Sequence, residues 1–264
     1  APANRRMGGG PPGAAPGTVV TPAVLLPQKT PAELAADAIA NKNTDFIFDG
    51  TMEGNMARAL PVFTDFVKGL AGSGAFIKSP TGAFTHPLVV KMHEIAPDPK
   101  AAAISIGQQL NLGVSGIMFV SVESAAEAKA GIDAMRFKAN GGTRSEDVGQ
   151  AAALWGMSER EYKAKADLWP LNPNGELVNW TIIESKEGLE RAVSALKAEG
   201  YGVEAGSAAD SDGRQVAALV RVRDPVGLVV EMSYGAMTRP QSPFYPPRPH
   251  AGFVTGDQGL GHVM

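Results

Sequence analysis

The sequence predicts an α/β fold, in which an incomplete (β/α)-barrel-like part is followed by a small α+β part. Up to about residue 190, short continuous apolar runs alternate with segments that carry apolar residues at helical spacing. Such alternation is typical of a parallel sheet with helices outside it. After Gly202 the pattern changes to two alternating strands around the turn sequence "DPVG", which indicates an antiparallel hairpin.

The first part shows five helical segments and four strand segments in strict alternation. Thr30, followed by a proline, predicts a helix start, and Ser124 with Glu127 three residues later has the pattern of a capping box. Gly113 predicts the end of the third helix. The expected helices cover residues 30–40, 55–74, 97–113, 124–138 and 186–202, and the expected strands cover 44–50, 88–92, 114–122 and 177–185.

Three segments are expected along the chain. Residues 1–18 consist mainly of Gly, Pro and Ala and are expected to form a flexible arm. Residues 19–190 are expected to form the β/α part, and residues 191–264 the second part, with its hairpin over 215–235.

Composition excludes several classes of function. The chain has 264 residues, a net charge of −3 and no basic block, so no nucleic-acid partner is expected. No run of eighteen apolar residues occurs, so no membrane span is expected. The absence of cysteine excludes disulfides and thiolate metal sites. We expect a cytoplasmic protein, or an exported one whose signal peptide has been removed.

Charged or hydroxyl-bearing residues follow each expected strand, in "DGTMEGN", "VKMHE", "VSVES" and "IIES". In a β/α barrel, function resides at the carboxyl ends of the strands. The sequence therefore predicts a site at one barrel mouth. His86 and His93 flank one strand, and each is expected to lie at the surface or to contact the site residues without being a ligand itself. The glycine-rich segment "GGTR" is only a weak signal for anion binding.

Residues 113–144 and the run "WGMSEREYKAKADLWPLNPNGELVNWTIIESKEGL" resemble the HpcH/HpaI aldolase and citrate lyase family, over about residues 22–190. The resemblance implies a Mg²⁺- or Mn²⁺-dependent lyase that acts on 2-oxo acids through a pyruvate enolate. Glu184 matches the metal-binding glutamate of that family, Lys91 stands where an arginine holds the substrate carboxylate, and Glu53 is expected near the reacting centre. Gly54 replaces the family's histidine, and the strand with the metal aspartate does not follow.

From about Leu189 onward, "VRVRDPVGLVVEMSYG" and "FVTGDQGLGHV" resemble the extradiol ring-cleavage dioxygenases that act on dihydroxybiphenyl-type catechols. In that family this stretch ends a non-catalytic module, of the vicinal-oxygen-chelate type, and enters the catalytic one. His262 matches the first ligand of the Fe²⁺ ion. The other histidine and the carboxylate of the metal site would lie beyond Met264.

Three functions follow from these resemblances. The main expectation is the metal-dependent carbon–carbon lyase with a small-molecule 2-oxo acid as substrate. The alternatives are an iron-dependent extradiol catechol dioxygenase and a non-catalytic chimeric scaffold. A homo-oligomer is expected, because an open barrel would leave edge strands in need of a partner.

Overall fold

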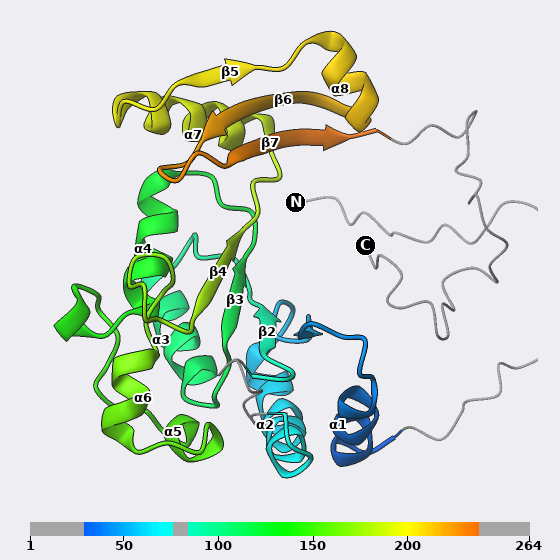
Figure 1. Ribbon diagram of the computed structural model, residues 1–264, viewed down its shortest axis with the longest axis vertical. Helices are drawn as coiled ribbons and strands as arrows, with labels where there is room; N and C mark the ends of the chain where they lie inside the picture. Colours follow the sequence, from blue (N-terminus) through cyan, green and yellow to red (C-terminus); the bar gives the residue numbers. More distant parts are fainter. Residues whose placement is uncertain (1–28, 76–83, 238–264) are drawn as a thin grey trace, which may run out of the picture.

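The computed structural model describes residues 29–75 and 84–237, which form a mixed α/β structure with two separate sheets (Figure 1). The first sheet contains the strands β1 (Ile47–Asp49), β2 (Leu88–Lys91), β3 (Gly116–Phe119) and β4 (Val178–Thr181). The helices that accompany it are α1 (Pro31–Ala40), α2 (Met56–Gly72), α3 (Pro99–Leu110), α4 (Ala125–Met135), α5 (Ala151–Leu154) and α6 (Glu159–Lys165), with a 3-10 turn η1 (Lys138–Asn140).

The four strands of the first sheet are parallel and lie in sequence order, β1-β2-β3-β4. The two faces of this sheet differ in burial. Leu88, Val90 and Ile117 are fully buried on the face that the helices cover. On the other face, Phe48 and Trp180, in the edge strands, are 46% and 36% exposed, and of these three residues only the central Val89 is buried. The expected parallel sheet with helices outside it is therefore confirmed, and the helices cover one face.

The open face of this sheet is concave. Phe46, just before β1, and Trp180, in β4, belong to opposite ends of the strand order, yet their ring centroids lie 5.0 Å apart in an edge-to-face contact. The sheet must curl for these rings to meet. The described strands nevertheless form no closed barrel, because β1 and β4 are not hydrogen-bonded to each other; the sheet has the four parallel strands that the sequence predicted.

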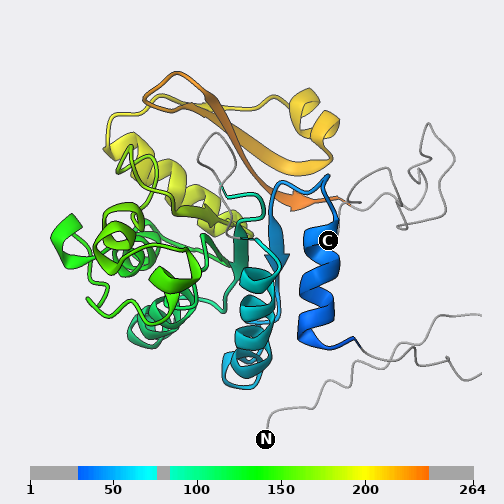
Figure 2. The same ribbon diagram turned by 60° about the horizontal axis from the view of Figure 1, so that its bottom comes forward.

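The second sheet is antiparallel and has the order β5-β6-β7, with β5 (Val203–Ala205), β6 (Val216–Arg223) and β7 (Val229–Ala236). The hairpin predicted around "DPVG" is confirmed, and Asp224 closes its turn by accepting from the backbone N–H groups of Val226 and Leu228. The sequence did not reveal β5 or the short helix α8 (Ala208–Arg214). Figure 2 shows this sheet lying across one end of the parallel part, with α1 beside α2.

Helix α7 (Lys186–Ala198) joins the two sheets and contacts both β5 and β7. Its Ser185 cap accepts from the N–H of Gly188. Thr30 forms the predicted cap of α1, with a complete capping box. At α4 the Ser124 cap is present, but the Glu127 carboxylate accepts from the N–H of Glu123 rather than from that of Ser124. The expected capping box at Ser124 is therefore only half formed.

Candidate functional site

The carboxyl ends of the four parallel strands bring together the residues that the sequence singled out. Glu53 follows β1, Lys91 ends β2, Ser121 follows β3 and Glu184 follows β4. Parallel strands place these ends at one edge of the sheet, so residues as far apart in the chain as Ser121 and Glu184 become neighbours. We refer to this edge, with Glu53, Lys91, Ser121 and Glu184, as the strand-end site.

Two of the candidate residues form an ion pair with each other. Lys91 Nζ lies 2.9 Å from Glu53 Oε1, and the side chains are 26% and 43% exposed. An ion pair of this exposure contributes about 0–1 kcal/mol to stability. The pair nevertheless has a chemical consequence, since the ammonium group and the carboxylate neutralise each other at the edge of the site.

Glu184 is held by the strand next to its own. Its Oε2 atom accepts hydrogen bonds from the backbone N–H of Ser121 at 2.9 Å and from the Ser121 hydroxyl at 3.0 Å. Ser121 has a φ of 49°, which is a left-handed conformation that non-glycine residues rarely adopt. The strained turn after β3 therefore presents both donors to one carboxylate oxygen. The sequence pointed to the hydroxyl in "VSVES" but not to this contact.

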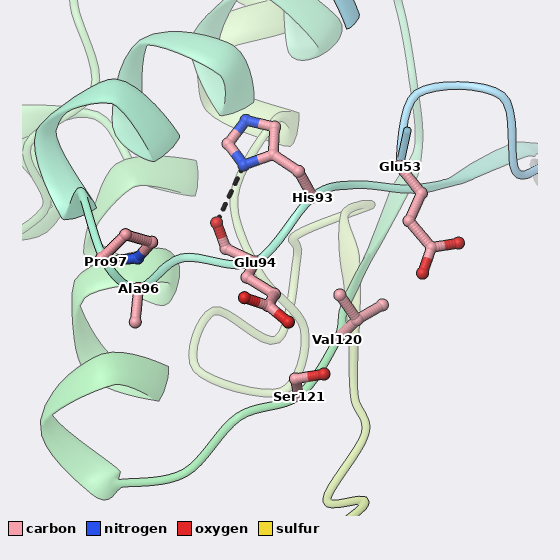
Figure 3. A pocket seen from close by; sticks show the side chains of 7 residues that line it. All are labelled: Glu53, His93, Glu94, Ala96, Pro97, Val120 and Ser121. Carbon is pink, nitrogen blue, oxygen red and sulfur yellow. Dashed lines mark hydrogen bonds between the residues drawn. The ribbon is translucent and has the colours of Figure 1, made fainter. Parts of the chain in front are cut away.

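A hollow of about 330 Å³ lies beside these residues, and Figure 3 shows the side chains around it. Glu53, His93, Glu94 and Ser121 supply its polar groups. His93 Nδ1 lies 2.8 Å from the carbonyl oxygen of Glu94, and Nε2 lies 2.9 Å from the hydroxyl of Ser105. Because a carbonyl only accepts, Nδ1 carries the proton, and in the neutral ring Nε2 accepts from Ser105.

The other flanking histidine is buried. His86 is 8% exposed, and its Nε2 lies 3.2 Å from the backbone oxygen of Asn41. It had been expected at the surface or around the site, and it lies instead at the opposite, amino-terminal end of β2. A tight contact with the loop before β1 keeps it from solvent.

The strand-end site does not offer a set of metal ligands. In residues 29–75 and 84–237, no group of three or more His, Asp or Glu side chains is arranged to hold a metal ion. Glu53 is paired with Lys91, and one oxygen of Glu184 is engaged by Ser121. The predicted role of Glu184 as a Mg²⁺ or Mn²⁺ ligand therefore has no support from its neighbours. His262, the predicted iron ligand, lies outside the described residues.

The "GGTR" segment does not form an anion-binding turn with its backbone. The N–H groups of Gly141, Gly142, Thr143 and Arg144 all donate to nearby carbonyl oxygens. The Arg144 side chain is buried, donates to Asn111 and to the Tyr162 hydroxyl, and stacks on Phe137. These contacts give the segment a structural role in packing the loop after α4.

Known proteins to which the chain is similar are named as dioxygenases. A biphenyl-2,3-diol 1,2-dioxygenase of Pseudomonas sp. (strain KKS102) is 39% identical over 125 residues, which is 46% of this chain and 43% of that protein. An enzyme of the same name from Paraburkholderia xenovorans (strain LB400) is 41% identical over 77 residues, or 29% of this chain and 26% of its own length. A 3-methylcatechol 2,3-dioxygenase of Pseudomonas putida is 39% identical over 82 residues, 31% of this chain and 28% of that protein.

The similarity covers only part of each chain. This chain spans less than half of the length of the curated relatives that it matches. A crystal structure of catechol 2,3-dioxygenase matches with 41% sequence identity over 30% of this chain and 27% of that one, and its TM-score of 0.24 is too low to bear on the fold. No family model matches the chain.

These relatives overturn the main functional expectation. The chain was expected to be a metal-dependent carbon–carbon lyase acting on 2-oxo acids, but the proteins that it matches are named as dioxygenases of vicinal aromatic diols. The lyase prediction is wrong, and the aldolase resemblance of residues 22–190 finds no support in these comparisons. The resemblance to extradiol dioxygenases is supported. In the part of the chain that the structure describes, no helix has the length and hydropathy needed to cross a bilayer.

Proposed function

We propose that the chain carries part of an iron-dependent extradiol dioxygenase that acts on vicinal aromatic diols. The observation that carries this proposal is the 39% identity over 125 residues to a biphenyl-2,3-diol 1,2-dioxygenase. The names of further relatives agree on the chemistry, since 3-methylcatechol and 1,2-dihydroxynaphthalene also have two adjacent hydroxyl groups on an aromatic ring. A small aromatic diol is therefore the proposed substrate class.

The part of the chain that we assign to this function begins at about residue 191. A match of 77 residues is close to the length of the segment from there to Met264, whereas the match of 125 residues is longer than this segment and so also includes residues before 191. The elements α7, β5, β6 and β7 are proposed to be a portion of a vicinal-oxygen-chelate module, and the sheet β1–β4 a separate, barrel-like portion of the chain. The domain limits at residues 18 and 190 also remain proposals.

The described residues do not fit an iron site of two histidines and one carboxylate, since no such group of ligands occurs in residues 29–75 and 84–237. The resemblance gives His262 as one ligand, and a single imidazole does not hold iron. The described part is accordingly assigned a supporting role, in which β5–β7 form a framework that precedes His262 in the chain. No chemical step is assigned to the strand-end site.

The proposal is tested by loading the full chain with Fe²⁺ under anaerobic conditions, adding 2,3-dihydroxybiphenyl and oxygen, and following the yellow ring-opened product. Iron-dependent product that disappears in His262→Ala but persists in His250→Ala supports the dioxygenase, and it would mean that ligands other than His262 complete the iron site. His250→Ala is the matched control, because the resemblance gives that histidine no role.

A folded chain that forms no product under these conditions argues instead for the second candidate, a non-catalytic scaffold. The lack of a ligand group in the described residues favours this candidate, and so do the open edges of both sheets, because β1, β4, β5 and β7 each have one unpaired side within the described ranges. A scaffold of this kind is expected to be a homo-oligomer. Analytical ultracentrifugation checks this, and a strictly monomeric, inactive chain would contradict both candidates.

A further inference from the structure

A largely apolar cavity of about 450 Å³ lies where α7 meets α4, the end of β4 and β7. Figure 1 shows these elements at the junction between the two sheets, and α7 contacts both α4 and β7. Alanines on both helices line the cavity: Ala125 and Ala128 on α4, and Ala192 and Ala195 on α7. Small side chains on facing helices leave the space between them unfilled.

The polar side chains that line this cavity are already engaged elsewhere. The Ser124 hydroxyl accepts from the N–H of Glu127 at the start of α4, and the Thr181 hydroxyl donates to Asn179. Glu199 is the charged residue of the lining, which includes no basic side chain. An anion would therefore meet no cation here, and water would find few partners. The chemistry of the wall favours a neutral, apolar ligand.

We propose that this cavity binds a small neutral aromatic molecule, at a place that none of the four strand-end residues lines. The volume lies within the range of small-molecule pockets, about 300–1,000 Å³. Met232 of β7 lines the cavity, and a methionine thioether packs well against aromatic rings. The ligand class rests on the proposed function, since the hydrocarbon rings of biphenyl and naphthalene diols have this chemistry.

The test uses biphenyl as the probe and the metal-free full chain. Biphenyl has no hydroxyl group, so it cannot ligate iron or be opened as a catechol, and its binding is independent of ring cleavage. The chain is labelled at the methionine methyl groups, and the Met232 resonance is assigned with Met232→Leu. We expect a saturable ring-current shift of the Met232 methyl resonance as biphenyl is added.

Filling the cavity provides the decisive comparison. Ala192→Leu and Ala195→Leu each place three further carbons in the cavity, and leucine has nearly the helix propensity of alanine. Each is expected to weaken biphenyl binding by about tenfold or more, because the added atoms occupy the ligand's space. Ser194→Leu is the matched control, since Ser194 lies on the same helix, is exposed and does not line the cavity; its binding is expected to match that of the unmodified chain.

Two results would overturn the inference. One is a Met232 resonance that does not move with biphenyl, and the other is a shift that persists unchanged in folded Ala192→Leu and Ala195→Leu chains. Biphenyl-4-carboxylate adds a check on the chemistry, since a carboxylate finds no basic partner and is expected to bind more weakly than biphenyl. Failure of ring cleavage would leave these outcomes unaffected, so the two proposals fail separately.

Discussion

The parallel and antiparallel sheets differ in how much apolar surface they bury. The parallel sheet and its helices enclose one continuous core, formed by residues from Ala35 to Leu177. In the antiparallel sheet, Leu219 and Val222 are buried, whereas the hairpin leaves Val226 89% exposed and Leu228 64% exposed. A sheet that leaves large apolar side chains in water has an incomplete core. The difference indicates that the β1–β4 part stabilises itself, while the β5–β7 part relies on α7 and on charged side chains.

The charged side chains of the two parts also differ in how deeply they are buried. In the parallel part, the buried Asp167 carboxylate receives two hydrogen bonds from Arg136, one from Asn172 and one from the N–H of Leu168. Burial raises the pKa of Asp167, but these hydrogen bonds outweigh it and hold the pKa below its usual value. In the antiparallel part, the corresponding ion pairs lie at the surface, where solvent weakens them.

The largest expected effect is a core truncation in the parallel part. Phe119 is fully buried, and its ring lies directly over Gly131 of α4. Phe119→Ala is expected to lower the free energy of unfolding by about 3–5 kcal/mol, because it leaves a cavity. Urea denaturation followed by tryptophan fluorescence measures this, since Trp155, Trp169 and Trp180 all lie in the parallel part.

Phe48→Ala is the matched control on the open face of the same sheet. Phe48 is 46% exposed, so its truncation is expected to cost only about 1 kcal/mol. Equal losses in the two variants would contradict the one-sided burial of this sheet, and would indicate that something covers the concave face in solution.

A smaller effect is expected from the antiparallel part. Leu219 is 2% exposed and packs against Gly206, where an added Cβ would lie 2.4 Å from Leu219 Cδ1. Leu219→Ala is expected to cost about 2 kcal/mol, at the low end for such truncations, because few buried neighbours surround it. Amide hydrogen exchange in β6 should accelerate while tryptophan fluorescence is unchanged. Leu228→Ala, at a residue 64% exposed, is the control, and it should alter neither.

Local signals in the sequence were enough for most of the fold. Thr30 and Ser124 mark helix starts that the structure confirms, "DPVG" marks the hairpin, and Gly113, with a φ of 84°, lies three residues beyond the end of α3 at Leu110. These features depend on neighbouring residues, so a single sequence reveals them. The curl that brings Phe46 to Trp180 depends on contacts between residues distant in the chain, which local patterns do not encode.

The strand-end site was predictable in position but not in its chemistry. The alternation of strands and helices predicted that Glu53, Lys91 and Glu184 would gather at one edge, and they do. The alternation could not predict the ion pair between Glu53 and Lys91, or the hydrogen bonds from Ser121 to Glu184, because both contacts join strands far apart in the chain. The lyase prediction relied on a resemblance that the known relatives do not share.

The smallest expected effect concerns the surface charges of the antiparallel sheet at low pH. The Arg221 guanidinium donates to both Asp210 and Glu231. Hydrogen bonds from Arg221 and then from Ser207 hold the pKa of Asp210 well below its usual value, and Arg214 and then Arg221 lower the pKa of Glu231. Carboxylates with lowered pKa values stabilise the folded state above the unfolded pKa values of 3.8 and 4.5, and this stabilisation is lost as the pH falls through the folded values.

Lowering the pH below 4.5 should therefore accelerate amide exchange in β6 after correction for intrinsic rates, with little change in the exchange of β3. Arg221→Gln should remove most of this pH dependence. Asp210 then loses its main hydrogen-bond donor, and Glu231 loses one of its two arginine donors. Arg223→Gln is the matched control on the same strand, because Arg223 donates to the carbonyl oxygen of Gly227 rather than to a carboxylate. The same pH slope in Arg221→Gln as in the unmodified chain would show that these surface pairs do not support the antiparallel sheet, and that α7 alone holds it in place.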